Sequence, residues 1–169
     1  SMASLWDPRY QGKVLAYDGG THNFSITNLL LGGAPFQIKD AEFAAVSAKL
    51  LELRRNVLTF YSQPQESIEL FRQHKIALLY ANYGRQQLKM LQDAGADVGY
   101  IIPREGALSW LDCWAISRST KNSLLAEQWI NFTLEPRVSQ ELSRRQGLSN
   151  TLVNRSENNN ADKIIWLEP

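Results

Sequence analysis

The sequence is poor in the residues that build disulfides and metal sites: its 169 residues include one cysteine, Cys113, and two histidines, His22 and His74. A single cysteine excludes an intrachain disulfide, and so few nitrogen and sulfur ligands argue against zinc. We therefore expect neither a metal nor any other cofactor. His74 lies in a polar stretch at the end of a predicted helix, where we expect it to be solvated.

Long apolar runs and an excess of one charge are also missing. No stretch of eighteen apolar residues is present, so the sequence predicts no membrane insertion. The formal net charge is +1 and acids and bases are mixed along the chain, so we expect no nucleic-acid partner. The first residues lack the apolar stretch of a signal peptide. Ser1 before Met2 resembles a tag remnant, which fits either a trimmed longer protein or a gene that begins at Met2.

What the sequence does contain is an alternation of strand-like and helix-like segments. Short apolar runs rich in β-formers predict strands, and apolar residues spaced three or four apart predict helices. Strands separated by helices indicate crossover connections, so we expect an α/β fold with a mostly parallel sheet flanked by helices. We predict strands over residues 13–17, 57–61, 76–81, 98–102 and 109–116, and helices over residues 24–31, 40–54, 84–94, 124–133 and 137–145, with another helix from Pro64.

Two polar loops follow predicted strands, at the edge of a parallel sheet where helix amino termini converge and ligands gather. The first also holds a glycine pair that allows close backbone approach, and Thr21 or Asn23 could cap the next helix. Either loop by itself is explained more simply as an ordinary connection between a strand and a helix. Neither loop has the glycine spacing of a dinucleotide-binding or phosphate-binding loop. The candidate binding residues in these loops are Asp18, Thr21, His22, Asn23, Asn82 and Tyr83.

Trp110 and Asp112 stand two apart on a predicted strand, so both side chains are expected on one face of the sheet. An indole face beside a carboxylate suits an organic cation, and a carboxylate in an apolar strand is costly unless it has a partner. The alternative is that Trp110 packs in the core and Asp112 accepts hydrogen bonds from neighbouring backbone. The residues alone favour neither interpretation.

A catalytic site is not predicted. Cys113, His22 and an acid could form a nucleophilic triad, but Cys113 lies on the same predicted strand, where a buried thiol is usually inert. We therefore expect a binding protein without catalytic residues. A small hydrolase that uses Asp18, His22 or Cys113 is the least favoured alternative.

Three stretches of the chain resemble a known protein family. They are LWDPRYQGKV at residues 5–14, IPREGALSWLDCWAI at residues 102–116 and NFTLEPRV at residues 131–138. In this order they resemble the second half of the spermidine/putrescine-binding proteins, the periplasmic solute-binding components of ABC transporters. The likeness covers nearly the whole chain.

The resemblance implies the second lobe of a type 2 periplasmic-binding fold, a two-lobed clamp that closes on a small solute and delivers it to an ABC transporter permease. It implies a solute-binding lobe over residues 1–111. Residues 112–150 would form a strand and a helical hairpin that belong to the first lobe in intact members, and residues 151–169 a polar tail that returns towards the second lobe. Intact members are periplasmic.

By the same resemblance, Trp110 and Asp112 contact the ligand and Tyr80 lies on the wall of the cleft. Two positions depart from the family pattern. The loop after the first strand carries only Asp18 where polyamine binders have several acids, and Leu148 stands where an aromatic residue is usual. A loop with fewer carboxylates is expected to hold a polycation less well, so a smaller or partly anionic solute is an alternative.

Most of the first lobe has no counterpart in this sequence, so the segment after Asp112 would leave apolar surface uncovered. We therefore expect self-association, including by exchange of segments, and solute binding that is weakened or lost. The alternative from another class is a vestigial or repurposed domain that acts as a structural or protein-interaction module.

Overall fold

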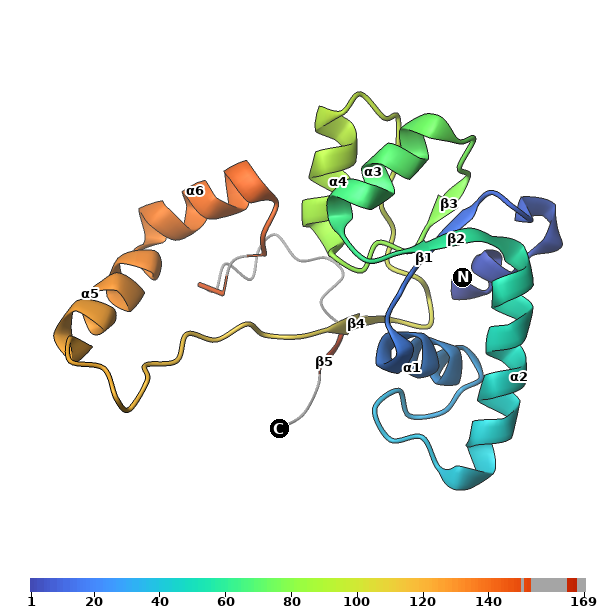
Figure 1. Cartoon of the computed structure of the whole chain (residues 1–169), viewed down its shortest axis with the longest axis horizontal. Helices are drawn as coiled ribbons and strands as arrows, with labels where there is room; N and C mark the ends of the chain where they lie inside the picture. Colours follow the sequence, from blue (N-terminus) through green and yellow to red (C-terminus); the bar gives the residue numbers. More distant parts are fainter. Residues whose placement is uncertain (150, 153–163, 167–169) are drawn as a thin grey trace.

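The structure is a computed structural model, and it describes residues 1–149, 151–152 and 164–166. Two short 3₁₀ helices, η1 (Met2–Trp6) and η2 (Pro8–Tyr10), open the chain, and strands and helices then alternate (Figure 1). The strands are β1 (Val14–Tyr17), β2 (Val57–Tyr61), β3 (Leu78–Leu79), β4 (Ala107–Ser109) and β5 (Ile164–Trp166). The helices are α1 (Gly20–Leu30), α2 (Asp40–Asn56), α3 (Pro64–Gln73), α4 (Gly84–Asp93), α5 (Ser123–Thr133) and α6 (Pro136–Gln146).

β1 is the central strand of a three-stranded parallel sheet with the order β2-β1-β3. Val14, Leu15 and Ala16 are at most 1% exposed, so both faces of β1 are covered. That burial explains why the strand sequence VLAY is continuously apolar rather than alternating. The register pairs Tyr17 with Tyr61, which brings the loops after β1 and β2 to the same edge of the sheet. The predicted α/β fold with a parallel sheet is confirmed.

Two pairs of helices flank the sheet. α1 packs on α2, and α3 packs on α4, with the three strands between these pairs in Figure 1. Val46 and Leu53 are seven residues apart on α2, so both project from one helical face, and both are fully buried. The residues of the core cluster come from η1, β1, α1 and α2 and are Met2, Leu5, Val14, Ile26 and Leu53.

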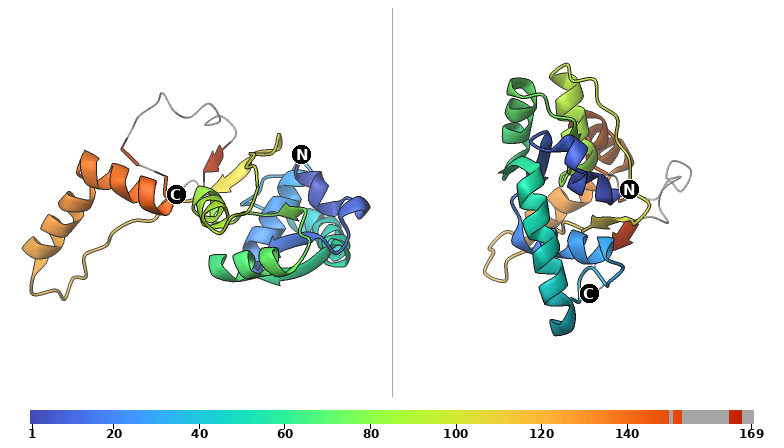
Figure 2. Two further views of the ribbon diagram at one scale, coloured as in Figure 1. Left: turned by 90° about the horizontal axis from the view of Figure 1, so that it is seen from above. Right: turned by 90° about the vertical axis from the view of Figure 1, so that its right-hand side faces the viewer.

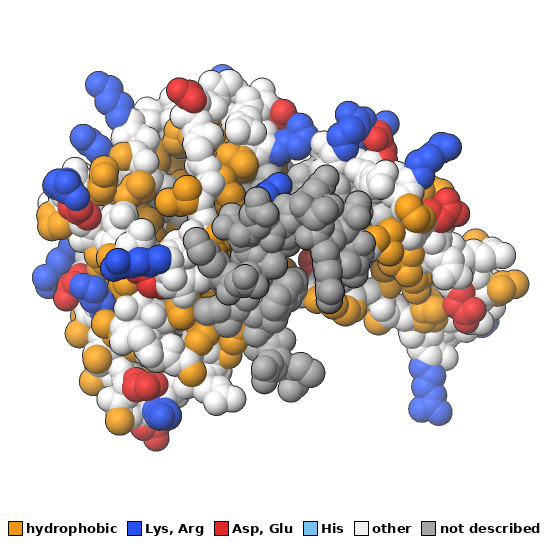
Figure 3. Space-filling model, turned by 180° about the vertical axis from the view of Figure 1, so that it is seen from behind, with side chains coloured by type: hydrophobic (Ala, Val, Ile, Leu, Met, Phe, Trp, Pro, Cys, Tyr) orange, Lys and Arg blue, Asp and Glu red, His pale blue; other side chains and the backbone are white. Residues whose placement is uncertain are grey.

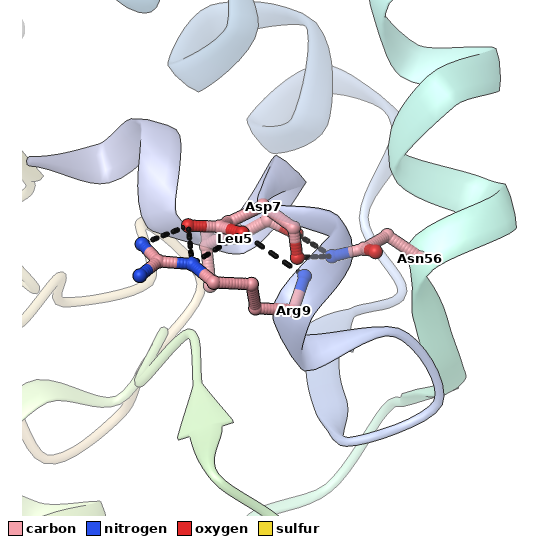
Figure 4. A network of polar contacts seen from close by, with 4 residues as sticks. All are labelled: Leu5, Asp7, Arg9 and Asn56. Carbon is pink, nitrogen blue, oxygen red and sulfur yellow. Dashed lines mark hydrogen bonds and ion pairs between the residues drawn. The ribbon is translucent and has the colours of Figure 1, made fainter.

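Asn56, the last residue of α2, fastens the beginning of the chain to the core (Figure 4). Its side-chain nitrogen Nδ2 donates hydrogen bonds to the backbone oxygens of Leu5, at 2.7 Å, and Asp7, at 3.1 Å. Asn56 is 5% exposed, so water does not replace these bonds if they are lost. On the outer side of the same turn, hydrogen bonds from Arg9 lower the pKa of the Asp7 carboxyl. Residues 5–10 therefore form a joint between η1, η2 and α2.

The predicted elements that are buried on one or two faces match the structure closely. The second strand spans the predicted residues 57–61, and α3 begins at Pro64 as predicted. α1 begins at Gly20, four residues earlier than predicted, because the Asn23 N–H donates to the Gly19 oxygen at 2.8 Å and closes the first turn there. Thr21 and Asn23 therefore lie inside α1 and are not its cap.

Three predicted strands need correction. β3 is limited to Leu78–Leu79 within the predicted residues 76–81, and residues 98–102 form no strand. The strand predicted over residues 109–116 is wrong for most of its length, because β4 ends at Ser109 and residues 110–116 have no hydrogen-bonded strand beside them in the described structure. β4 pairs instead with β5, in parallel, with Leu108 opposite Ile165.

α5 and α6 follow one another with a bend between them and lie away from the α/β body, at the end of an extended segment (Figure 2). This bent pair of helices is called the hairpin below. The hairpin returns to the body at Gly147, which follows α6 with a left-handed φ of 69°. A Cβ atom at Gly147 would lie 2.8 Å from the backbone oxygen of Arg85 at the start of α4, so the two backbones approach closely there. The predicted division at residues 111 and 150 stays a prediction. Of the predicted tail, residues 153–163 and 167–169 lie outside the described residues.

Candidate functional site

A cleft of about 610 Å³ lies between the first turns of α1, the loop after α1 and the strand β4. Loops and helix starts at the carboxyl end of β1 form one side, as is usual for ligand sites on parallel sheets. The volume is in the range of sites for small molecules. The residues that line the cleft are Thr21, His22, Phe24, Ser25, Pro35, Phe36, Ile38, Leu108, Ser109 and Trp110.

Trp110 and His22 meet across the cleft. Their ring centroids are 5.5 Å apart with an interplanar angle of 84°, an edge-to-face contact. Trp110 is 42% exposed, so much of its indole remains available to a ligand. Burial lowers the pKa of His22, so the imidazole is neutral at pH 7. His22 also contacts Tyr17 edge-to-face at 5.6 Å, which links the cleft to the end of β1.

The backbone between β1 and α1 explains how His22 reaches the cleft. The Asp18 N–H donates to the Tyr61 oxygen at 2.8 Å, so the β1–β2 pairing extends one residue beyond the strand. A Cβ atom at Gly19 would lie 2.5 Å from the Tyr17 ring, so a larger residue there would displace the ring that contacts His22. The Asn23 side-chain nitrogen donates to the Tyr17 oxygen at 2.9 Å and holds the start of α1 over the end of β1.

The second predicted loop is anchored by a buried tyrosine. The hydroxyl of Tyr61 lies 2.5 Å from the backbone oxygen of Tyr80 and accepts a hydrogen bond from the Asn82 N–H at 3.1 Å. Burial raises the pKa of Tyr61 to about 12, so this hydroxyl keeps its proton. Gln87, which is fully buried, lies 3.0 Å from the same hydroxyl and donates to Ser67 at 2.6 Å. The network fixes the loop between β3 and α4.

The cleft contains three of the predicted site residues, Thr21, His22 and Trp110. Tyr80 packs against the core cluster, and burial raises the pKa of its hydroxyl. Asp18 is exposed at the end of β1, and Tyr83 donates to the Ser62 oxygen at 3.1 Å. Asn23 and Asn82 each bury a side-chain oxygen that has no hydrogen-bond partner within the described residues.

The expected pairing of Trp110 with Asp112 on one strand face is absent, because both residues lie beyond the end of β4. Asp112 is exposed and makes no hydrogen bond or ion pair in the part of the chain that the structure describes. Cys113 is also exposed, which corrects the expectation of a buried thiol. The apolar run of residues 110–116 predicted a strand, but a strand also needs a neighbour to accept its backbone hydrogen bonds.

Sequence reasoning missed the apolar part of the cleft. Phe24, Phe36 and Leu108 line it, and Ser25 lines it while only 4% exposed. The helical spacing of His22 and Ser25, three apart on α1, could have indicated that both face the same way. Phe36 follows a proline in an irregular loop, where no periodicity predicts the direction of a side chain.

β4 is held in place by Glu105, which stands just before it. The Glu105 carboxylate accepts hydrogen bonds from the hydroxyl of Ser1 and from the N–H of Met2, the latter at 2.9 Å. Burial alone would raise the pKa of Glu105, but these hydrogen bonds and those from residues 104–105 outweigh it and lower the pKa to about 2. The carboxylate is therefore charged at neutral pH and ties the strand that carries Leu108 to the start of the chain.

No group of three or more His, Cys, Asp or Glu side chains is arranged to hold a metal ion within the described part of the chain. Among the same residues, no helix combines the length and apolar character needed to cross a membrane.

The chain is similar to periplasmic binding proteins in sequence. It is 28% identical over 143 residues to spermidine/putrescine-binding periplasmic protein 1 of Haemophilus influenzae, covering 85% of this chain and 39% of that protein. It is 26% identical over 147 residues to the spermidine/putrescine-binding periplasmic protein of Escherichia coli, covering 87% of this chain and 41% of that one. The chain thus spans about two fifths of the length of these curated relatives.

Solved structures share the fold. A spermidine/putrescine ABC transporter substrate-binding protein from Streptococcus pneumoniae superposes with a TM-score of 0.71 at 21% identity, covering 88% of this chain and 45% of that chain. An ABC transporter protein from Clostridium perfringens gives a TM-score of 0.69 at 20% identity, covering 99% of this chain and 56% of that chain. The family model described as bacterial extracellular solute-binding protein matches residues 1–163. The chain therefore belongs to the bacterial extracellular solute-binding protein family.

Proposed function

We propose that this chain forms one wall of a cleft that binds a small, polyamine-like or related solute for an ABC uptake system. The observation that supports this most directly is the contact of Trp110 with His22, because it joins the first turn of α1 to the segment after β4 around one cleft. The names of the curated relatives support spermidine and putrescine as the first solutes to test. An ABC transporter permease is then the protein partner, and the periplasm is the place of action.

Binding without catalysis fits the described residues. The rings next to His22 belong to Tyr17 and Trp110, and His22 forms no hydrogen bond with an acid or with Cys113 in the described structure. A general base needs such a partner to fix its tautomer and to act on a nucleophile. Among the described residues, the hydrolase alternative therefore has no catalytic group of side chains to support it.

A thermal-shift screen tests the proposed function. The whole chain is screened with spermidine, putrescine, amino acids and small carboxylates. A solute that binds only the folded state raises the Tm. At a solute concentration of a hundred times its Kd, the folded state gains about 2.7 kcal/mol. We expect Trp110→Ala to abolish the shift, because the indole is the largest exposed ring in the cleft. Trp129→Ala, which removes an exposed indole from α5, should keep it. A shift that survives Trp110→Ala would contradict the assigned cleft.

We further propose that the chain self-associates through an apolar surface on the hairpin and the segment before it. This hairpin face consists of large side chains, each at least 37% exposed: Leu111, Trp114, Ile116, Leu124, Leu125, Trp129, Phe132, Leu134 and Leu142. Orange side chains gather over this part of the molecule in Figure 3. Trp114 and Trp129 meet edge-to-face at 6.3 Å, so the extended segment and α5 contribute to one surface.

The size of the hairpin face suits a second copy of the chain. Large apolar side chains carry roughly 200 Å² each, so half-exposed ones amount to on the order of 1,000 Å² here. That area exceeds the largest patch of a typical monomer, about 300–600 Å², and matches the roughly 800 Å² per partner of a standard interface. The same face is the specific observation that favours the second candidate function, a protein-interaction module.

Light scattering at micromolar concentration tests the self-association. We expect a dimer or larger species for the wild-type chain and a shift to monomer for Trp129→Glu, because a charge buried in an apolar interface has no partner. The matched control is Phe43→Glu, which puts the same charge at an exposed aromatic position on α2, outside the hairpin face. A wild-type monomer would contradict the proposal, and so would equal behaviour of both variants.

A further inference from the structure

A continuous series of ring contacts runs along the carboxyl edge of the sheet and leads to the cleft. The Tyr17 ring, at the end of β1, contacts three other rings edge-to-face. These are the rings of His22 at a centroid distance of 5.6 Å, Tyr61 at 5.8 Å and Tyr83 at 5.9 Å. His22 in turn contacts Trp110 at 5.5 Å. Tyr17 therefore joins β2 and the start of α4 to the rings that line the cleft.

One end of this series is fixed within the core. Tyr61 is fully buried, and its hydroxyl is held by the backbone of Tyr80 and Asn82. Moving the Tyr61 ring would break these buried hydrogen bonds, and a buried polar group that loses its partner is costly. The Tyr17 ring packs against this fixed neighbour, so its own position is supported from the core side.

The loop after β1 leaves space for the Tyr17 ring at one glycine. A Cβ atom at Gly19 would lie 2.5 Å and 2.8 Å from two carbons of that ring. The φ of Gly19 is −143°, which alanine adopts readily, so the collision with the ring is the main cost of a side chain there. A Cβ atom at Gly20, by contrast, meets no atom of the described residues within 4 Å. The two neighbouring glycines therefore differ in whether a methyl group would displace Tyr17.

The side chain of Tyr17 has a role that is separable from that of its backbone. The Asn23 side-chain nitrogen donates to the Tyr17 backbone oxygen, and the Tyr17 backbone pairs in register with Tyr61. These contacts hold β1 and α1 in place whatever side chain stands at position 17. The ring supplies the contact with His22, and edge-to-face pairs stabilise a particular geometry in addition to the area they bury.

We propose that Tyr17 is a positioning residue for the cleft, whose ring fixes the imidazole of His22 against Trp110. Tyr17 acts on the solute through these two rings, which line the cleft. A change that moves the Tyr17 ring therefore weakens solute binding, even when the ring itself is retained. This inference rests on the proposed solute-binding function and identifies a residue that orients the same site.

Isothermal titration of the whole chain with spermidine and putrescine at pH 8 tests the effect on binding. At this pH the imidazole is neutral, so a change in Kd reports its position and not its charge. We expect Tyr17→Leu to raise the Kd about fivefold, and Tyr17→Phe, which keeps the ring, to restore it to within about twofold of wild type. Gly19→Ala should act like Tyr17→Leu, whereas Gly20→Ala is the matched control and should bind like wild type.

Proton NMR of the chain without solute tests the positioning itself. The sequence has two histidines, so the imidazole signals of His22 and His74 can be assigned and followed with pH. Burial lowers the pKa of His22 in the wild-type chain. We expect Tyr17→Leu and Gly19→Ala to raise this pKa towards its ordinary value, because water reaches the imidazole once the ring is lost or displaced. Tyr17→Phe and Gly20→Ala should retain the lowered pKa.

The two measurements distinguish this inference from the function on which it rests. An unchanged His22 pKa in Tyr17→Leu and Gly19→Ala would overturn the positioning role, whether or not a solute binds. A raised pKa with an unchanged Kd would overturn it too, because the cleft would then bind its solute without the Tyr17 contact. A raised pKa in folded protein that binds neither probe would support the positioning of His22 and count against the proposed polyamine-like solute. If Tyr17→Leu folds poorly, Gly19→Ala tests the same contact with the whole ring present.

Discussion

Replacing Asn56 with aspartate is expected to lower the free energy of unfolding by about 3 kcal/mol at pH 7, because it leaves a buried charge without a partner. The substitution changes the donor Nδ2 into an oxygen that faces the backbone oxygens of Leu5 and Asp7, now at 2.7 and 3.1 Å. Two hydrogen bonds become two repulsive contacts at a position that is 5% exposed. Urea denaturation followed by circular dichroism measures the loss.

Two variants and a pH series make the Asn56 experiment specific. Asn56→Ala removes both bonds without adding charge and should cost about 2 kcal/mol. Asn122→Asp makes the same chemical change at the exposed N-cap of α5 and should stay within about 0.5 kcal/mol of wild type. Burial raises the pKa of a carboxyl at position 56 in the folded state, so the Asn56→Asp variant should regain stability as the pH falls towards about 4. Wild-type stability of this variant at pH 7 would show that the joint does not hold the chain start.

The α/β body could be predicted because its segments carry their own local signals. β1 and β2 are apolar runs that end in polar loops, and α2 repeats apolar residues at helical spacing. These patterns arise where one or both faces of a strand or helix are buried. In the α/β body, the elements that bury these faces belong to the chain itself. The start of α1 was missed because Gly19 and Gly20 indicated a loop, whereas the backbone hydrogen bond from the Asn23 N–H to the Gly19 oxygen makes Gly20 the first residue of the helix.

Residues 98–102 and 110–116 show what local signals leave out. Both runs are apolar and rich in residues that favour strands, and neither is a strand in the structure. A strand forms when a neighbour satisfies its N–H and C=O groups, and no segment of the described chain does so for either run. Trp114 is 62% exposed, so the second run also lacks the burial that stabilises a strand.

Part of the candidate site could likewise be predicted from the sequence, and part could not. Thr21 and His22 were predicted from the loop after β1, and Trp110 from its spacing with Asp112 and from the resemblance. These three residues meet in one cleft. Ser25 and Phe36 were not predicted, because their role depends on how α1 and the following loop turn towards β4. The position of a loop relative to a distant strand is a tertiary property that residue spacing does not encode.

Gly147→Ala is expected to detach the end of the hairpin from α4. A Cβ atom there would lie 2.8 Å from the Arg85 oxygen and 2.9 Å from the Gln86 Cα, and both are backbone atoms that cannot move aside cheaply. The left-handed φ of 69° adds about 1 kcal/mol of strain for alanine, and overpacking adds about 1–3 kcal/mol. We expect amide hydrogen exchange in α6 to accelerate roughly tenfold or more while exchange in β1 and β2 is unchanged.

Gly95→Ala is the matched control for this prediction. Gly95 follows α4 with a similar left-handed φ of 84°, but a Cβ atom there meets nothing within 4 Å, so the variant carries the strain without the collision. Its effect should be limited to about 1 kcal/mol and should not reach α6. The difference between the two variants then measures the close contact of the hairpin with α4. Equal exchange in α6 for both would mean that the hairpin does not dock through Gly147.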